Sequence, residues 1–231
     1  MPESAPFHPW AVLFTPENLR FLAWGFGVTL RIALGAMAIS FAAGVVLGTA
    51  RFAGDRFPES PLARGVAALA TVYIEVIRNL PMLLIMLAVR FLTPIPAIWA
   101  AITGMSIFTA AIMAEIVRGG LMSVEQGQWE AAASQGLSLW QTLRWIVLPP
   151  ALRRMVPALV SEFITITKDT TFAWSLGIQE LLGSGVILFN RYLNAMQVFA
   201  LIAVVFFTVD FLMSLAARAL ERRTGEGLAT Q

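Results

Sequence analysis

The chain of 231 residues has no cysteine and only one histidine, His8. It therefore forms no disulfide and offers no thiolate to a metal, and one histidine argues against a histidine-based metal centre. The single lysine, Lys168, follows Thr167 and not a glycine, and no G-x-x-x-x-G-K-S/T phosphate-binding loop occurs. A nucleophile elbow is also missing. We therefore expect no metal site, no cofactor and no catalytic site in this chain, and do not expect an enzyme.

Charge is scarce as well. Only 13% of the residues are charged and 58% are hydrophobic, whereas soluble domains carry about 25% charged residues. Charge-free runs at 32–50 and 93–114 are long enough to cross a bilayer, which takes about 20 apolar residues in a helix. The N-terminus carries Glu3 and no basic segment, unlike a secretory signal peptide. The sequence predicts an all-α integral membrane protein, with residues 1–231 forming a single transmembrane domain.

Five membrane spans are predicted from the apolar blocks, at about residues 21–50, 63–91, 96–117, 151–167 and 192–217. Thr15-Pro16-Glu17 has the composition of a helix start, with threonine as N-cap and proline in the first turn. Gly44-x-x-x-Gly48 lets a neighbouring helix approach closely. Pro81 removes a helical hydrogen bond, so we expect the second span to kink or break there. Residues 168–194 contain three glycines and are expected to form a broken segment before the last span.

The distribution of arginine predicts the orientation of the chain. Arginines follow the first apolar block, flank the polar segment at 121–149 and recur in the C-terminal tail, but are missing from 94–99. Lysine and arginine near the ends of spans mark the cytoplasmic side. We therefore predict an N-terminus outside the cell and a cytoplasmic C-terminus and polar segment.

The polar segment at about residues 121–149 carries helix signals of its own. Two Ser-x-x-Gln capping boxes begin at Ser123 and Ser138, and Gly136 between them is a natural helix terminator. Leu148-Pro149-Pro150 is expected to stop the second helix, since a residue before proline avoids helical geometry. The sequence predicts two short helices joined at Gly136 and lying at the membrane surface.

Residues 130–149 read EAAASQGLSLWQTLRWIVLP. The spacing of Glu-Ala-Ala, glycine, isoleucine and Leu-Pro resembles the coupling loop of ABC-importer permeases. Three further stretches, EVIRNLPML from Glu75, AEIVRGG from Ala114 and TKDTT from Thr167, resemble signature segments of the polar amino-acid uptake permeases, the histidine, glutamine and glutamate-aspartate type. The resemblance extends from about residue 20 to 220. Asn79-Leu80 and Thr171-Phe172 depart from the usual Gly-Thr and Ser-Leu, which weakens only the assignment of a substrate.

This resemblance implies a permease subunit of the type I importer fold in a bacterial inner membrane. It implies an ATPase dimer that binds ATP and magnesium, a second permease copy or paralogue, and an extracytoplasmic substrate-binding protein, but no nucleic acid. A polar amino acid would cross the lipid bilayer by alternating access. By the same likeness Glu130 makes the polar contact with the ATPase, Ala131 and Ala132 allow close approach, and Gly136 permits the turn. The implied coupling residues are Glu130, Ala131, Ala132, Gly136, Ile146, Leu148 and Pro149.

Charged residues inside the predicted spans need a cavity or a partner, because one at mid-bilayer costs about 3 kcal/mol. The candidates for the substrate path are Glu75, Arg78, Pro81, Glu162, Lys168 and Asp169. Glu75 and Arg78 stand at i,i+3 and can pair, and Glu115 and Arg118 repeat that spacing as an expected structural pair. Lys168 and Asp169 could bind the two ends of a zwitterion or partners on other helices. The alternative that all these charges only lock the helices together stays open.

Two other classes of protein compete with the permease. An ion-coupled secondary transporter usually shows an internal repeat with paired broken helices, and the two halves of this chain show no self-similarity. A structural membrane protein has no use for a capped polar hairpin. The sequence does not identify the amino acid.

Overall fold

The computed structural model describes the backbone of residues 9–225 and the side chains of residues 10–219, so Glu3 and His8 lie outside it, and Arg222 and Arg223 are described by their backbone alone. No strand occurs within these bounds. The helices are α1 (Pro9–Leu13), α2 (Pro16–Arg56), α3 (Pro61–Arg78), α4 (Met82–Leu92), α5 (Ala97–Met122), α6 (Gln126–Ser134), α7 (Leu139–Gln141), α8 (Leu148–Asp169), α9 (Leu181–Tyr192) and α10 (Ala195–Gly225). A π-helical turn, Thr142–Val147, precedes α8, and a 3-10 turn, Thr170–Leu176, follows it.

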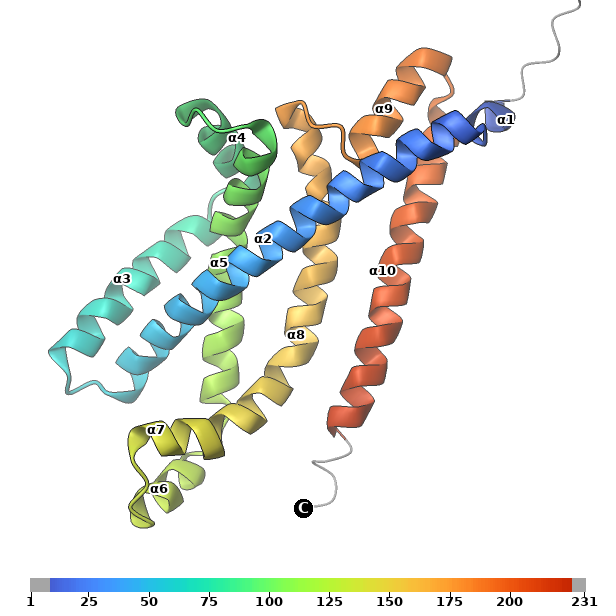
Figure 1. Ribbon diagram of the computed structural model, residues 1–231. Coiled ribbons are helices and arrows are strands. Elements are labelled where there is room, and N and C mark those ends of the chain that lie inside the picture. Colours follow the sequence, from blue (N-terminus) through green and yellow to red (C-terminus); the bar gives the residue numbers. More distant parts are fainter. Residues whose placement is uncertain (1–8, 226–231) are drawn as a thin grey trace, which may run out of the picture.

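The long helix α2 crosses the bundle diagonally and contacts α3, α5, α8 and α9 (Figure 1). The short helices α6 and α7 form a hairpin at the end of the bundle where α5 finishes and α8 begins. Helices α4 and α9 lie toward the opposite end. The predicted all-α fold with a short-helix hairpin is therefore confirmed.

The start of α2 follows the expected signals. The Thr15 hydroxyl accepts a hydrogen bond from the backbone N–H of Asn18 at 3.4 Å, and Pro16 occupies the first turn. No proline interrupts the helix after that, so it continues for 41 residues, to Arg56. It is thus longer at both ends than the predicted span at 21–50, and its last turns carry charged residues.

The second predicted span is broken where Pro81 occurs. Helix α3 ends at Arg78, Pro81 is the N-cap of α4, and the axes of the two helices differ by 101°. The expected break is confirmed, and its cause is the proline, which lacks an N–H and cannot continue the hydrogen bonding of α3.

Three described helices are long and apolar enough to cross a membrane: α2, α5 and the part of α10 from Ala195 to Ala219. The count rises to five if α3 with α4, and Leu139–Leu176 with α9, each form one bent span. The helix α8 extends the predicted span at 151–167 only to 148–169. The number and limits of the crossings remain predictions.

Close packing of α2 on α5 depends on small residues. A Cβ on Gly44 would collide with Met113, and one on Gly48 would collide with Val117. The prediction that these glycines admit a neighbouring helix is confirmed, and the neighbour is α5 of the same chain. A cluster of buried apolar side chains between α2, α4 and α5 fills the centre of the bundle.

Two predictions for the hairpin are wrong. Ser123 does not cap α6: its hydroxyl donates to the carbonyl of Gly120 and the N-cap is Glu125, because α5 extends to Met122 and captures the serine at its end. Leu148-Pro149-Pro150 does not stop a helix either but begins α8. The preceding π-helical turn changes the hydrogen-bond register, so the prolines fall in the first turn of α8, where a missing N–H costs little.

Candidate functional site

The hairpin of α6 and α7 is shaped by a glycine and one capping box. Gly136 has a φ of 73°, a left-handed conformation that favours glycine, and it ends α6. The Ser138 hydroxyl accepts from the N–H of Gln141 at 3.4 Å, while the Ser138 N–H donates to the Gln141 side chain at 2.8 Å. The predicted turn at Gly136 and the second capping box are confirmed.

The helix α6 has an inner and an outer face. Trp129 and Ala132 stand three residues apart on one face and are 7% and 3% exposed. Glu130 and Ala131 are exposed, and the Glu130 carboxylate accepts from the Gln126 side chain at 3.2 Å. Ala132 thus packs into its own chain, unlike Ala131. The outer face offers a carboxylate beside a small residue at the tip of the molecule, which suits a groove on a partner.

The later residues of the coupling pattern attach the hairpin to the bundle. Leu148 packs against a cluster of buried side chains from α2, α5, α6 and α8, and Val147 beside it is fully buried. Ile146 is half-buried and Pro149 is exposed. Their place in the structure is at the base of the hairpin, while Glu130 and Gly136 lie on its exposed part. The coupling role of all seven residues stays a prediction.

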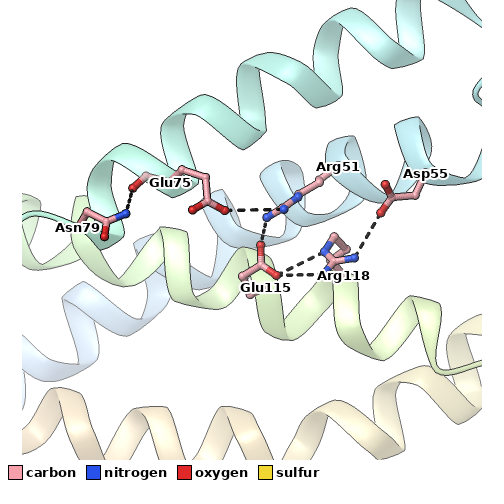
Figure 2. A network of polar contacts seen from close by, with 6 residues as sticks. All are labelled: Arg51, Asp55, Glu75, Asn79, Glu115 and Arg118. Carbon is pink, nitrogen blue, oxygen red and sulfur yellow. Dashed lines mark hydrogen bonds and ion pairs between the residues drawn. The ribbon is translucent and has the colours of Figure 1, made fainter.

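An ion-pair network joins α2, α3 and α5 (Figure 2). Glu115 and Arg118 pair at 3.2 Å, as predicted. The second oxygen of Glu115 accepts from Arg51, and the Arg51 guanidinium is 3.8 Å from Glu75. Asp55 accepts from Arg118 at 3.3 Å. Sequence reasoning did not find Arg51 and Asp55 as partners, since they lie 64 and 63 residues away in the chain from Glu115 and Arg118.

The expected pair of Glu75 with Arg78 is wrong. The Glu75 carboxylate points toward Arg51 of α2, which lies beside α3 (Figure 2). Arg78 is the exposed last residue of α3, and none of the ion pairs among the described side chains includes it. The partner of Glu75 therefore comes from the neighbouring helix α2, whereas sequence spacing had predicted a partner within α3.

The remaining substrate-path candidates gather at the end of α8. Lys168 lies near enough to Asp169 and to Asp210 of α10 for their opposite charges to interact, and Asp169 and Glu162 are near enough for their like charges to interact. None of these pairs is among the ion pairs of the described side chains. The described side chains show no ion pair between this group and Glu75 or Arg78. The candidates thus form two separate sets, one at α3 and one between α8 and α10. Pro81 stands at the break between α3 and α4 and provides backbone groups rather than charge.

Glu180 is a buried carboxylate that sequence reasoning missed. Its side chain accepts from the N–H groups of Leu182 and Gly183, both at 2.8 Å, and so caps α9. Thr29 of α2 donates to it at 3.4 Å and accepts from the N–H of Leu181 at 3.1 Å. Glutamate is not a preferred N-cap residue, so capping rules do not identify Glu180. The one sequence feature that could have drawn attention to it is an isolated carboxylate in an apolar stretch. These bonds fasten the start of α9 to α2.

Metal binding finds no support among the described residues, where no group of three or more His, Cys, Asp or Glu side chains could hold an ion.

The chain is similar to known transport proteins over almost its full length. Residues 62–226 match the family described as "Binding-protein-dependent transport system inner membrane component". The "Probable glutamine ABC transporter permease protein GlnP" of Bacillus subtilis (strain 168) is 41% identical over 218 residues, which are 91% of this chain and 96% of that protein. The "Glutamine transport system permease protein GlnP" of Escherichia coli (strain K12) is 32% identical over 221 residues, 93% of this chain and 96% of that protein.

A solved structure agrees with these sequence matches. The "Crystal structure of an amino acid ABC transporter with histidines" contains a chain that is 25% identical and superposes with a TM-score of 0.83. The superposition covers 95% of this chain and all of that one.

Proposed function

The chain belongs to the family of binding-protein-dependent transport system inner membrane components, and we propose that it imports a polar amino acid, with glutamine as the first candidate. It is a membrane permease subunit of an amino-acid ABC transporter, a type of subunit that is not an enzyme and works with a separate ATPase. Glutamine is preferred because the two relatives described above, at 41% and 32% identity, are named for it.

The observation that carries the coupling part of the proposal is the two-faced helix α6. Its inner face is anchored in the bundle and its outer face presents Glu130 and Ala131. A helix of this kind, laid into a groove, is a common mode of recognition between proteins. The groove would belong to an ATPase subunit, which supplies the ATP and magnesium, and Gly136 sets the direction in which α6 projects.

The same proposal includes the assembly around the chain. Five spans are few to enclose a path for a solute, so the path would lie between this permease and a second copy or a paralogue. A substrate-binding protein would dock on the outer side, where the placement of arginine would put the N-terminus. The hairpin and the C-terminus would be cytoplasmic, according to the placement of arginine. Closure of an ATPase dimer would tilt the two permeases and so alternate access to the amino acid.

A tagged preparation from gently solubilised membranes tests this function. We expect mass spectrometry to find an ATPase with the chain, with or without a second permease, which distinguishes a heterodimer from a homodimer. Reconstituted into vesicles with its binding protein, the complex is expected to take up glutamine only when ATP is supplied, and unlabelled competitors then rank other amino acids. Recovery of this chain alone, under conditions that preserve a control importer, contradicts the proposal.

We expect Asp169→Asn and Glu75→Gln to lower uptake without lowering assembly. Each change keeps the shape of the side chain but removes a charge that a zwitterion's ammonium group would contact. Loss of one hydrogen bond to a charged group corresponds to about a tenfold change or more in rate. The measurement is initial uptake at limiting amino acid, with the exposed Glu17→Gln as control. Unchanged uptake in both variants would leave these two charges as structural links only.

A further inference from the structure

The last two turns of α2 connect the hairpin to the rest of the bundle. On one side, Arg51 and Asp55 form ion pairs with α3 and α5 (Figure 2). On the other side, Phe52 and Arg56 contact Trp129 of α6. Residues at i and i+4 share a face of a helix, so the two pairs occupy two faces of the same short segment. Because a helix segment moves as a rigid unit, a displacement of the face that contacts Trp129 also displaces the face that carries the ion pairs.

Trp129 is the residue of α6 that this segment holds. Its ring is 5.9 Å from the ring of Phe52, centroid to centroid, and the Arg56 guanidinium lies 4.8 Å from its centre. The ring is almost fully buried, whereas Trp140, one helix further along the hairpin, is 67% exposed. The Arg56 Nε is enclosed and has no hydrogen-bond partner, so the ring is its main contact. This cation–π arrangement holds the ring from one side, with Phe52 against it.

Little else joins α2 to α6. Their backbones scarcely approach each other, and a hollow of about 340 Å³ separates the end of α2 from the start of α6, lined in part by Asp55 and Glu125. The two helices meet through side chains, and Trp129 supplies the contacts of α6. The linker between α5 and α6 is also held by α8. Arg154 of α8 donates to the carbonyl of Ser123, which directly follows α5.

We propose that Trp129, held by Phe52 and Arg56, is the positioning residue that passes a movement of α6 to α2. From α2 the movement reaches α5 through Arg51 and Glu115, and it reaches α3 through Arg51 and Glu75. This inference rests on the proposed function, in which α6 receives the movement from an ATPase. Trp129 itself faces away from the surface that would dock on the ATPase. Its loss should therefore impair the transmission of movement from α6 and leave the binding of α6 to the ATPase unchanged.

The test compares transport with hydrolysis in the reconstituted complex of permease, ATPase and binding protein. We expect Trp129→Leu to keep the ATPase bound and its basal hydrolysis unchanged, while amino acid imported per ATP falls about tenfold, a loss within the usual range for coupling between linked sites. Trp129→Phe, which keeps an aromatic face for Arg56, is expected to restore most of that ratio. Arg56→Gln is expected to fall between them, because the Phe52 contact remains.

Trp140→Leu is the matched control, since it makes the same substitution on the same hairpin at an exposed position; it is expected to leave imported amino acid per ATP unchanged. The proposal is overturned if Trp129→Leu leaves that ratio unchanged, or if it lowers hydrolysis and import in parallel. A complex that loses its ATPase in Trp129→Leu also overturns it, because the residue would then serve assembly. If the wild-type chain recovers no ATPase, the proposed function itself fails.

Discussion

Glu130→Ala is expected to weaken binding of the ATPase by about thirtyfold or more, the effect of removing a contact worth about 2 kcal/mol from the centre of an interface. The Glu130 carboxylate is exposed, and its one hydrogen bond within the described chain is to Gln126, at the surface. Exposed pairs of this kind contribute a few tenths of a kcal/mol to a helix. The loss should therefore appear in binding and leave the fold intact. Copurification of the tagged permease with its ATPase, over a range of ATPase concentrations, measures it.

The control is Glu59→Ala, which removes an exposed carboxylate from the connection between α2 and α3. A second variant, Gly136→Val, tests the same surface through the backbone. A Cβ at position 136 would meet no other atom within 4 Å, so its cost is that of a left-handed conformation for a β-branched residue, about 1–2 kcal/mol. The turn is expected to change and to redirect α6 without unfolding the bundle. Normal ATPase recovery in both variants would contradict the assignment of the hairpin.

Local signals in the sequence predicted the local structure of this chain well. Thr15-Pro16 begins α2, Pro81 separates α3 from α4, and Gly136 turns the hairpin, since each of these features is determined by one or two neighbouring residues. Ser138 caps α7 for the same reason. The capping box at Ser123 failed because two helices competed for one serine, and the longer helix α5 kept it.

Contacts between distant segments were beyond the reach of spacing rules. Glu75 was assigned to Arg78 at i,i+3, whereas Arg51 of another helix occupies the place of its partner. The spacing rule succeeded for Glu115 and Arg118, where one carboxylate contacts arginines on its own and a neighbouring helix. The role of Pro149 and Pro150 at the start of α8 depends on the preceding π-helical turn, and no local motif in the sequence predicts that turn. The buried Glu180 shows the same limit, because its link to α2 is made by Thr29, 151 residues away.

The residues of the coupling pattern were identified from the sequence. Which of them face outward and which pack against the bundle was not. The anchors from Ile146 to Pro149 lie at the base of the hairpin, and Ala132 faces inward with Trp129. Which residue of an amphipathic helix points outward depends on what the helix packs against, in this chain the cluster formed by α2, α5 and α8. The face carrying Glu130 and Ala131 is therefore a result of the fold.

Glu115→Ala is expected to cause the largest loss of stability among the charges of the network. Its side chain is 23% exposed and it contacts two guanidiniums, those of Arg51 and Arg118. Removing it leaves each cation with one weaker partner, Glu75 at 3.8 Å and Asp55 at 3.3 Å. Hydrogen bonds to charged groups contribute about 2 kcal/mol each. Loss of the contacts to both guanidiniums therefore corresponds to a fall of about 10 °C in the midpoint of thermal unfolding for a chain of this size. Thermal unfolding in detergent measures it.

Asp55→Ala separates this effect from the general loss of a carboxylate. Asp55 is 43% exposed and accepts from one guanidinium only, and exposed ion pairs contribute about 0–1 kcal/mol. Its midpoint should therefore change little, and 1 M salt should abolish the remaining difference, because exposed charges are screened within about 3 Å at that ionic strength. The effect of Glu115→Ala should largely persist in high salt, since Glu115, Arg51 and Arg118 are only 21–28% exposed and partly buried charges are screened much less. Equal losses in the two variants, or a loss at Glu115 that salt removes, would mean that the network adds nothing beyond surface ion pairing.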